Sequence, residues 1–207
     1  MSAYPNIETA LNIWQEGIEY RSSTTNFLTH DEYVFHTKGV AESAKIIAEN
    51  TMYLNPEKAY VLGLLHDYGK KYDERKSKIF HVKAGYEEML KMGYDDVAKI
   101  CLTHSFPNKN FDDKDYSSYL PEWLDWSHKK LKSVEYDDYD RLIQLCDMFF
   151  EGLNKVSFEK RFLGIRNRYN LKPEQTANME KFALLNKEYF SDLCKEDVYK
   201  LLNISNI

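Results

Sequence analysis

The residues of this chain that could do chemistry are histidines and aspartates set among apolar neighbours. Four of its six histidines and two of its aspartates share this setting: His36, His66, Asp67, His81, His104 and Asp147. A buried carboxylate without a partner is costly, so each aspartate needs a cation, a basic side chain or a cluster of hydrogen-bond donors. Imidazole nitrogens combined with carboxylate oxygens are typical transition-metal ligands, and a metal is the simplest explanation of the set.

Each member of the set also has an ordinary structural explanation. A single interior histidine is more often a hydrogen-bonded core residue than a ligand, and Asp147 by itself fits a buried salt bridge equally well. The combination favours a metal, because a chain with six histidines has placed four of them on apolar faces. His30 and His128 lie in polar surroundings and are the expected exceptions.

The elements that must position these residues are helices. With 8 Gly and 5 Pro in 207 residues and no internal repeat, the sequence favours long helices and an all-α fold. Apolar spacing predicts a first helix over 6–21. The capping-box pattern Thr29-x-x-Glu32 predicts a second helix from Thr29 to about Asn50, which carries His36 on an apolar stripe.

The adjacent pair His66 and Asp67 follows an apolar run within a third predicted helix. Asn55 as N-cap and Pro56 at the first position start this helix, which should extend over 57–68 until Gly69 ends it. Neighbouring helical residues point about 100° apart, so both can reach one cation only near the helix end. Two further helices should carry the remaining histidines. The fourth carries His81 on one face and extends up to Gly93, and the fifth carries His104.

The later part of the chain alternates between irregular and helical patterns. The stretch 105–136 lacks periodicity and is expected to be a long loop, with at most one short helix over 122–131. A buried helix from about Asp138 should carry Asp147 in its middle, and Pro173 should separate two of the helices that follow. Those last helices are expected over 158–169, 174–189 and 196–203.

This pattern resembles the HD superfamily of metal-dependent phosphohydrolases. The family order is a His, a His-Asp pair about 30 residues later and a distal Asp, which His36, His66-Asp67 and Asp147 match. The segments FHTKGVAESAKIIAE and LGLLHDYGKK are similar to the family's first helix and to its His-Asp motif, respectively. The resemblance covers about 26–152 and implies one HD-type helical bundle over 1–207, with extra N-terminal helices and a C-terminal extension over 153–207.

The resemblance also implies roles for individual residues. His36, His66, Asp67 and Asp147 would hold one metal, and His81 and His104 would hold a second, with Asp67 bridging the two. This matches dinuclear family members such as the bacterial symmetrical dinucleoside-tetraphosphate hydrolases. The ions would be divalent transition metals, namely iron, manganese, zinc or nickel, and Asp67 and Lys70 would be the catalytic residues, with the Lys70 ammonium on a substrate phosphate.

Three other features are weaker candidates for binding the substrate. The basic run 155–172 could help to bind polyphosphate, although a solvated helix face is the more common explanation. Arg141 lies nearly two turns before Asp147 and is expected to face elsewhere. Aromatic residues of the long loop could stack on a nucleobase, but ordinary packing is the default expectation: Phe106, Phe111, Tyr116, Tyr119, Trp123 and Trp126.

Composition limits the partners and the compartment. The net charge of −5 argues against general nucleic-acid binding, and no apolar stretch approaches the length of a membrane span. Three cysteines without C-x-x-C spacing fit reduced thiols in a cytoplasmic protein, and the N-terminus lacks a secretory pattern. The expected partner is a small phosphorylated molecule, and the sequence leaves the oligomeric state open.

Three functions therefore compete. The favoured one is hydrolysis of a phosphomonoester or phosphoanhydride in a small nucleotide-like substrate by metal-activated water. A minority of HD proteins are mixed-valent di-iron oxygenases with a similar His and Asp set, so the ligands alone do not separate these two activities. A non-catalytic nucleotide sensor would be favoured if ligands were missing, and none of the six is missing here.

Overall fold

Helices pack around one central helix that is buried on nearly every side. The computed structural model describes residues 3–23, 27–72, 77–109, 116 and 119–205. The first three helices are α1 (Ile7–Ser22), α2 (Phe27–Glu49) and α3 (Pro56–Leu65). Six of the ten residues of α3 are buried, and Gly63 lets it approach α2 closely, since a Cβ there would lie 2.8 Å from Ala41 Cα.

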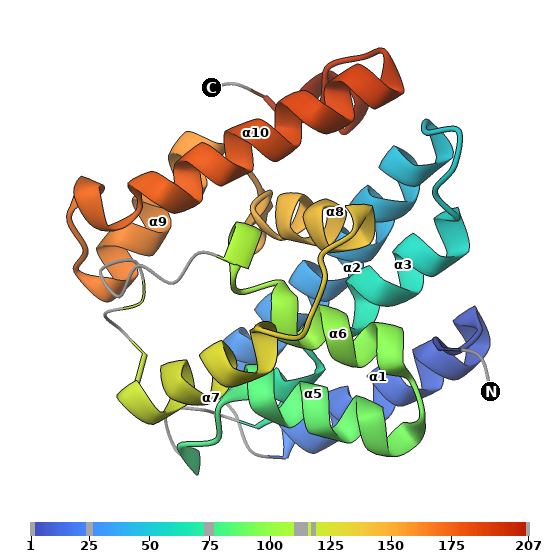
Figure 1. Cartoon of the computed structure of the whole chain (residues 1–207), viewed down its shortest axis with the longest axis vertical. Helices are drawn as coiled ribbons and strands as arrows, with labels where there is room; N and C mark the ends of the chain where they lie inside the picture. The colour runs from blue at the N-terminus through green and yellow to red at the C-terminus, as the bar shows by residue number, and fades with distance from the viewer. Residues whose placement is uncertain (1–2, 24–26, 73–76, 110–115, 117–118, 206–207) are drawn as a thin grey trace.

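The next elements bring two further helices against the same core. The 3-10 helix η1 (Tyr68–Lys71) is followed by α5 (His81–Met92) and α6 (Asp95–Thr103). Gly93, with a φ of 83°, ends α5 in the left-handed conformation that glycine adopts without strain, and this allows α6 to return beside α5 (Figure 1).

A smaller hydrophobic cluster lies under the region expected to be a loop. The short η2 (Pro107–Lys109) precedes α7 (Pro121–Leu131), whose Leu131 is fully buried. The buried members of the cluster come from several elements: Phe80, Val82, Leu102, Phe106, Tyr116 and Leu131. The described aromatic residues of this region therefore pack as a local core, while Phe111 lies outside the described residues.

The C-terminal part covers the other side of the bundle. Helix α8 (Asp138–Asp147) starts with a capping box between Asp137 and Asp140 and leads into a hairpin of β1 (Phe150–Glu151) and β2 (Asn154–Lys155). After α9 (Phe158–Tyr169), η3 (Pro173–Gln175) leads into α10 (Ala177–Cys194) and α11 (Val198–Leu201). Figure 1 shows α10 along the edge of the bundle beside α9, with α8 between α10 and the pair α2 and α3.

The all-α fold class is confirmed, and several predicted boundaries were wrong. Helix α2 begins at Phe27, so Thr29 does not start it, and α3 ends at Leu65 rather than Tyr68. Gly69 lies inside η1, because the chain must turn there to pass under α5. Local sequence patterns reveal apolar spacing, but they do not reveal the contacts between distant segments that end a helix early.

Differences in the C-terminal half have the same origin. Asp147 is the last residue of α8 and does not lie in the middle of a helix, because the chain turns into the unpredicted hairpin at 150–155. The predicted helix over 174–189 is observed as α10, three residues later at its start and five at its end. The predicted helix over 196–203 is shortened to α11, and the one over 158–169 is confirmed.

The helices of the structure were also compared with the length and hydropathy that a bilayer requires. Among the described residues, none combines enough length with enough apolar character to cross a membrane.

Candidate metal centre

Asp67 lies at the centre of four imidazole rings. Its Oδ2 is 3.5 Å from His36 Nε2 and 3.4 Å from His66 Nε2. Its Oδ1 is 3.2 Å from His104 Nε2 and 3.7 Å from His81 Nε2. The two oxygens of one carboxylate thus face two separate pairs of histidines.

Two groups of candidate ligands result, and they share one residue. Ligand atoms of His36, His66 and Asp67 lie within 4.8 Å of one another, and so do those of Asp67, His81 and His104. Each group has the nitrogen and oxygen donors and the spacing that could hold a transition-metal ion. The structure therefore brings together all four histidines that the sequence singled out.

Asp147 lies beside the first of these groups. Its Oδ1 is 3.0 Å from His36 Nε2 and 3.9 Å from His66 Nε2. Its position at the end of α8 brings the carboxylate to the place where α2 and α3 meet. The sixth residue singled out from the sequence thus also reaches the cluster.

The cluster forms where several elements begin or end. His66 and His104 are the C-cap residues of α3 and α6, and His81 is the first residue of α5. Asp67, with φ −103° and ψ 19°, has left the α-helical conformation, so its side chain is not held to the 100° spacing from His66. The early end of α3 is what lets the adjacent pair face the same space.

Backbone carbonyls fix the orientation of two of the rings. His66 Nδ1 lies 2.7 Å from the Gly63 carbonyl, and His104 Nδ1 lies 3.0 Å from the Ile100 carbonyl. A carbonyl can only accept, so each Nδ1 donates and each Nε2 can keep its lone pair for the cluster. Lone pairs that converge on a buried carboxylate fit a cation between them, so the donor set suits a metal ion.

Comparison with known proteins shows the family. The sequence model of the HD domain matches residues 33–149, which is more than half of the chain. The chain belongs to the HD domain family. Proteins of this family are generally metal-dependent hydrolases, which agrees with the donor set. Neither the curated proteins nor the solved structures contain a match to this chain.

Charge balance within this HD domain keeps its carboxylates ionised. Burial alone would raise the pKa of Asp67, but Lys70 and the neighbouring histidines outweigh burial and hold it well below its usual value. Burial likewise opposes ionisation of Asp147, and its hydrogen bond with His36 lowers its pKa. Both carboxylates therefore stay charged at neutral pH, as metal ligands must.

Two basic side chains reach the cluster. Lys70 Nζ is 2.6 Å from Asp67 Oδ2, and 40% of the Lys70 side chain remains exposed to solvent. Arg161 Nη2 is 3.8 Å from Asp147 Oδ1. Lys70 was singled out from the HD motif, whereas Arg161 was one member of a basic run for which a solvated face was the default expectation.

A sequence signal for Arg161 existed but was not used. Arg161 lies three residues after Phe158 and one before Phe162, on the apolar stripe that α9 turns toward the core. A basic residue within such a stripe is buried against something, and here that partner is acidic. The sequence also gave no sign that Phe150 would pack edge-on against His36, with ring centroids 5.9 Å apart.

The other candidates lie away from the cluster or in structural roles. Arg141 pairs with Asp138 and stacks on Tyr189, which agrees with its expected position away from the site. Within the basic run, Lys155 donates to the Leu202 carbonyl and Arg166 pairs with Glu180, so these two stabilise the fold.

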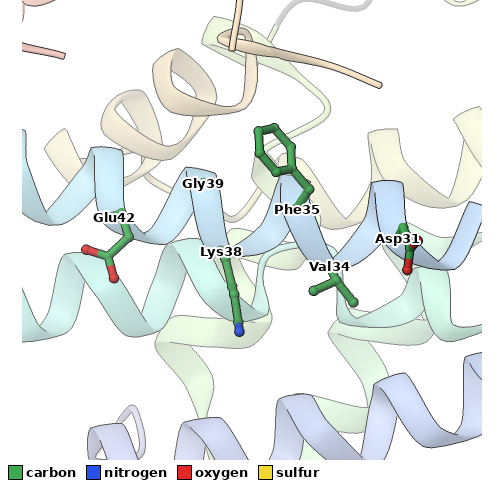
Figure 2. Close-up of a pocket in the computed structure, with 6 residues that line it drawn as sticks. All are labelled: Asp31, Val34, Phe35, Lys38, Gly39 and Glu42. Carbon is green, nitrogen blue, oxygen red and sulfur yellow. The ribbon is translucent and has the colours of Figure 1, made fainter. Parts of the chain in front are cut away.

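A surface hollow on α2 is separate from the HD cluster. Its lining residues all belong to one side of that helix: Asp31, Val34, Phe35, Lys38, Gly39 and Glu42. Figure 2 shows Phe35 pointing away from Val34 and Lys38. None of the six residues of the cluster lines this hollow.

Proposed function

We propose that this protein hydrolyses a phosphomonoester or phosphoanhydride bond of a small nucleotide-like substrate with water activated at two divalent metal ions. One observation carries the proposal. The two oxygens of Asp67 face different histidine pairs, and the Lys70 ammonium lies against the same carboxylate. Shared carboxylates of this kind hold pairs of ions in enzymes that act on phosphate esters.

The ligands divide between the two ions. His36, His66 and Asp147 would hold the first ion and His81 and His104 the second, and Asp67 would offer one carboxylate oxygen to each. The distances among these donors support the assignment. Imidazole and carboxylate donors in this mixture suit iron, manganese, zinc or nickel.

Ions held by these residues would lower the pKa of a water molecule and polarise a phosphoryl oxygen, and so would supply the nucleophile and stabilise the transition state. In hydrolysis the water oxygen forms a bond to phosphorus, the bond from phosphorus to the leaving oxygen breaks, and that oxygen takes up a proton. Lys70 donates hydrogen bonds to the phosphoryl oxygens, on which negative charge is concentrated. Asp67 holds the Lys70 ammonium and thereby sets its direction.

Lys70 is also the observation that favours hydrolysis over the di-iron oxygenase alternative. The Lys70 ammonium lies 2.6 Å from a buried Asp67 oxygen, on a side chain that is 40% exposed, and provides a cation beside the cluster. Phosphate is a substrate group that a lysine ammonium commonly binds. The four-histidine set would suit either activity.

The proposal is tested by metal content and by phosphate release. Protein purified without chelators should contain close to two transition-metal ions per chain by elemental analysis. It should also release phosphate from at least one member of a panel of nucleotides and phosphomonoesters. Two irons together with oxygen consumption and no phosphate release would favour the oxygenase, and absence of metal would contradict both functions.

The bridging role of Asp67 gives a sharper test. Asp67→Asn removes the charge that faces both histidine pairs, so we expect loss of both ions and of phosphate release. Asp192→Asn, an exposed aspartate of α10, serves as the matched control and should retain both. Elemental analysis of the two variants checks the prediction, and full metal loading of Asp67→Asn would refute the bridge.

A further inference from the structure

Arg161 extends from the C-terminal helix α9 to the edge of the metal cluster. Its side chain is 13% exposed, and its Nη2 is 3.8 Å from the Asp147 carboxylate. Residue 161 lies beyond the HD match at 33–149, so family membership does not assign it a role. The structure alone brings it to the centre.

A second acidic residue fixes the direction of this arginine. Arg161 Nη1 donates to Glu151 Oε2 at 2.8 Å, while Arg168 pairs with the other Glu151 oxygen. Gly164 leaves room for this carboxylate, since a Cβ there would lie 2.5 Å from Glu151 Cδ. Glu151 therefore anchors two arginines, and a single negative charge cannot neutralise both.

The anchored guanidinium retains donors for another ligand. A separation of 3.8 Å exceeds a hydrogen bond, so the contact of Nη2 with Asp147 is electrostatic and leaves Nη2 able to donate elsewhere. Arg161 Nε is also buried, with no hydrogen-bond partner among the described residues. A buried arginine N–H rarely lacks a protein acceptor unless a ligand or a water molecule accepts its hydrogen bond.

We propose that Arg161 binds the phosphoryl group of the substrate from the Asp147 side of the centre, while Lys70 binds it from the Asp67 side. This inference rests on the proposed function. The planar guanidinium matches the geometry of phosphate oxygens, and its connection to Glu151 holds Nη2 toward the centre before the substrate arrives. The C-terminal extension would thus complete a substrate site whose metal ligands all lie within the HD match.

The charges of the centre support an anionic ligand. Two divalent ions would outweigh the charges of Asp67 and Asp147. Lys70 and Arg161 add further positive charge, of which Glu151 offsets only a part because Arg168 shares it. A dianionic phosphoryl group would neutralise this excess, whereas an uncharged substrate would leave it uncompensated in a poorly solvated site.

The competing explanation is that Arg161 only stabilises the ionised Asp147. That role would make Arg161 necessary for metal loading or folding and irrelevant to substrate binding once the ions are present. The two explanations therefore differ in whether removal of the guanidinium affects phosphate affinity in fully metal-loaded protein.

The experiment compares Arg161→Gln and Arg161→Lys with Arg141→Gln, a control at an arginine that pairs with Asp138 away from the cluster. Metal content, the thermal midpoint and the binding of inorganic phosphate by calorimetry are measured for each protein. We expect Arg161→Gln to retain its metal and to lose about tenfold or more in phosphate affinity, with a matching rise in KM. Arg161→Lys keeps the charge but lacks the planar guanidinium with its paired donors, and should lose less phosphate affinity. Arg141→Gln should match the wild type.

Two results would overturn the inference alone, and a third would overturn it together with the proposed function. Unchanged phosphate affinity in metal-loaded Arg161→Gln would remove Arg161 from the substrate site while hydrolysis by the wild type still stood. Loss of metal in both Arg161 variants would show instead that Arg161 only stabilises the ionised Asp147. A metal-loaded wild type that neither binds phosphate nor releases it would refute the proposed function and this inference with it.

Discussion

At the scale of the residue, two adjacent lysines after Asp67 have opposite environments. Lys70 is 40% exposed and directs its ammonium to Asp67, on the cluster. Lys71 is 11% exposed, pairs with Glu88 and lies over the ring of Tyr68, with its Nζ 4.3 Å from the centroid. The same residue type therefore serves the site at one position and the packing of η1 against α5 at the next.

This difference predicts opposite effects of the same substitution. Lys70→Met should lower kcat/KM for phosphate release by about 10²-fold, because it removes a donor to the developing charge. In metal-loaded protein it should leave stability nearly unchanged, because the bound ions would still neutralise the buried Asp67 carboxylate. Lys71→Met should instead cost roughly 1–3 kcal/mol of unfolding free energy, because Glu88 loses its buried partner. Steady-state kinetics and urea denaturation separate the two effects, and equal loss of activity in both variants would contradict this assignment.

The proton on His36 gives a prediction about pH. Burial by itself would lower the pKa of His36, but hydrogen bonds with Asp147 and Asp67 outweigh burial and raise it above 6.5. The folded state thus binds this proton more tightly than the unfolded state does. The resulting stabilisation is complete below about pH 6.5 and is lost as the pH rises through the raised pKa.

Thermal unfolding of chelator-treated protein across this range provides the measurement. The midpoint of the wild type should fall as the pH rises above about 6.5, and the midpoint of His36→Gln should lack this component. Identical pH profiles for the two proteins would show that the proton on His36 does not stabilise the metal-free fold.

At the scale of the element, the site depends on how closely η1 lies under α5. A Cβ on Gly69 would be 1.9 Å from the His81 carbonyl oxygen and 2.7 Å from the Gly85 nitrogen. Both neighbours are backbone atoms, so the clash cannot be relieved by a side-chain rotation. The glycine thus sets the distance between Asp67, just before η1, and His81, at the start of α5.

We therefore expect Gly69→Ala to disrupt the second group of candidate ligands, Asp67, His81 and His104. It should cost roughly 1–3 kcal/mol of stability through overpacking and should move His81 away from Asp67, with loss of one of the two metal ions. Gly17→Ala is the comparison, since its Cβ would meet only the ring of Tyr68, at 3.0 Å, and should leave the metal content unchanged. Two ions in Gly69→Ala, by elemental analysis, would contradict the prediction.

At the scale of the whole molecule, the C-terminal helices share the hydrophobic core of the HD helices. Phe158, Phe162, Phe190 and Val198 belong to the same buried cluster as α2 and α3. We propose on this basis that residues 1–207 form one domain, in which 153–207 is an extension that cannot separate from the rest without exposing apolar surface.

A substitution in α10 tests whether the chain unfolds as one domain. Phe190 is fully buried, so Phe190→Ala should cost about 3–5 kcal/mol. Leu184 on the same helix is 51% exposed, and Leu184→Ala should change stability by less than about 0.5 kcal/mol. The tryptophans all lie in α1 and α7, outside the extension, so a shift of the denaturation curve followed by their fluorescence would show one cooperative unit. Separate transitions would show two domains.

The sequence by itself determined the residues of the cluster and the class of fold. Six ligand candidates were identifiable because histidines and aspartates are costly on apolar helix faces, and helical periodicity is a local property that neighbouring residues reveal. The start of α3, with Asn55 as N-cap before Pro56, was correct for the same reason.

Only the tertiary structure decided how those residues face one another. The early end of α3, the turn after Asp147 and the division of the Asp67 oxygens between two histidine pairs all depend on contacts between segments distant in the chain. Arg161 shows the same limit, because its partners lie 10 or more residues away, across a hairpin that local patterns did not predict. Periodicity reports which side of a helix is buried, whereas long-range packing decides what that side meets.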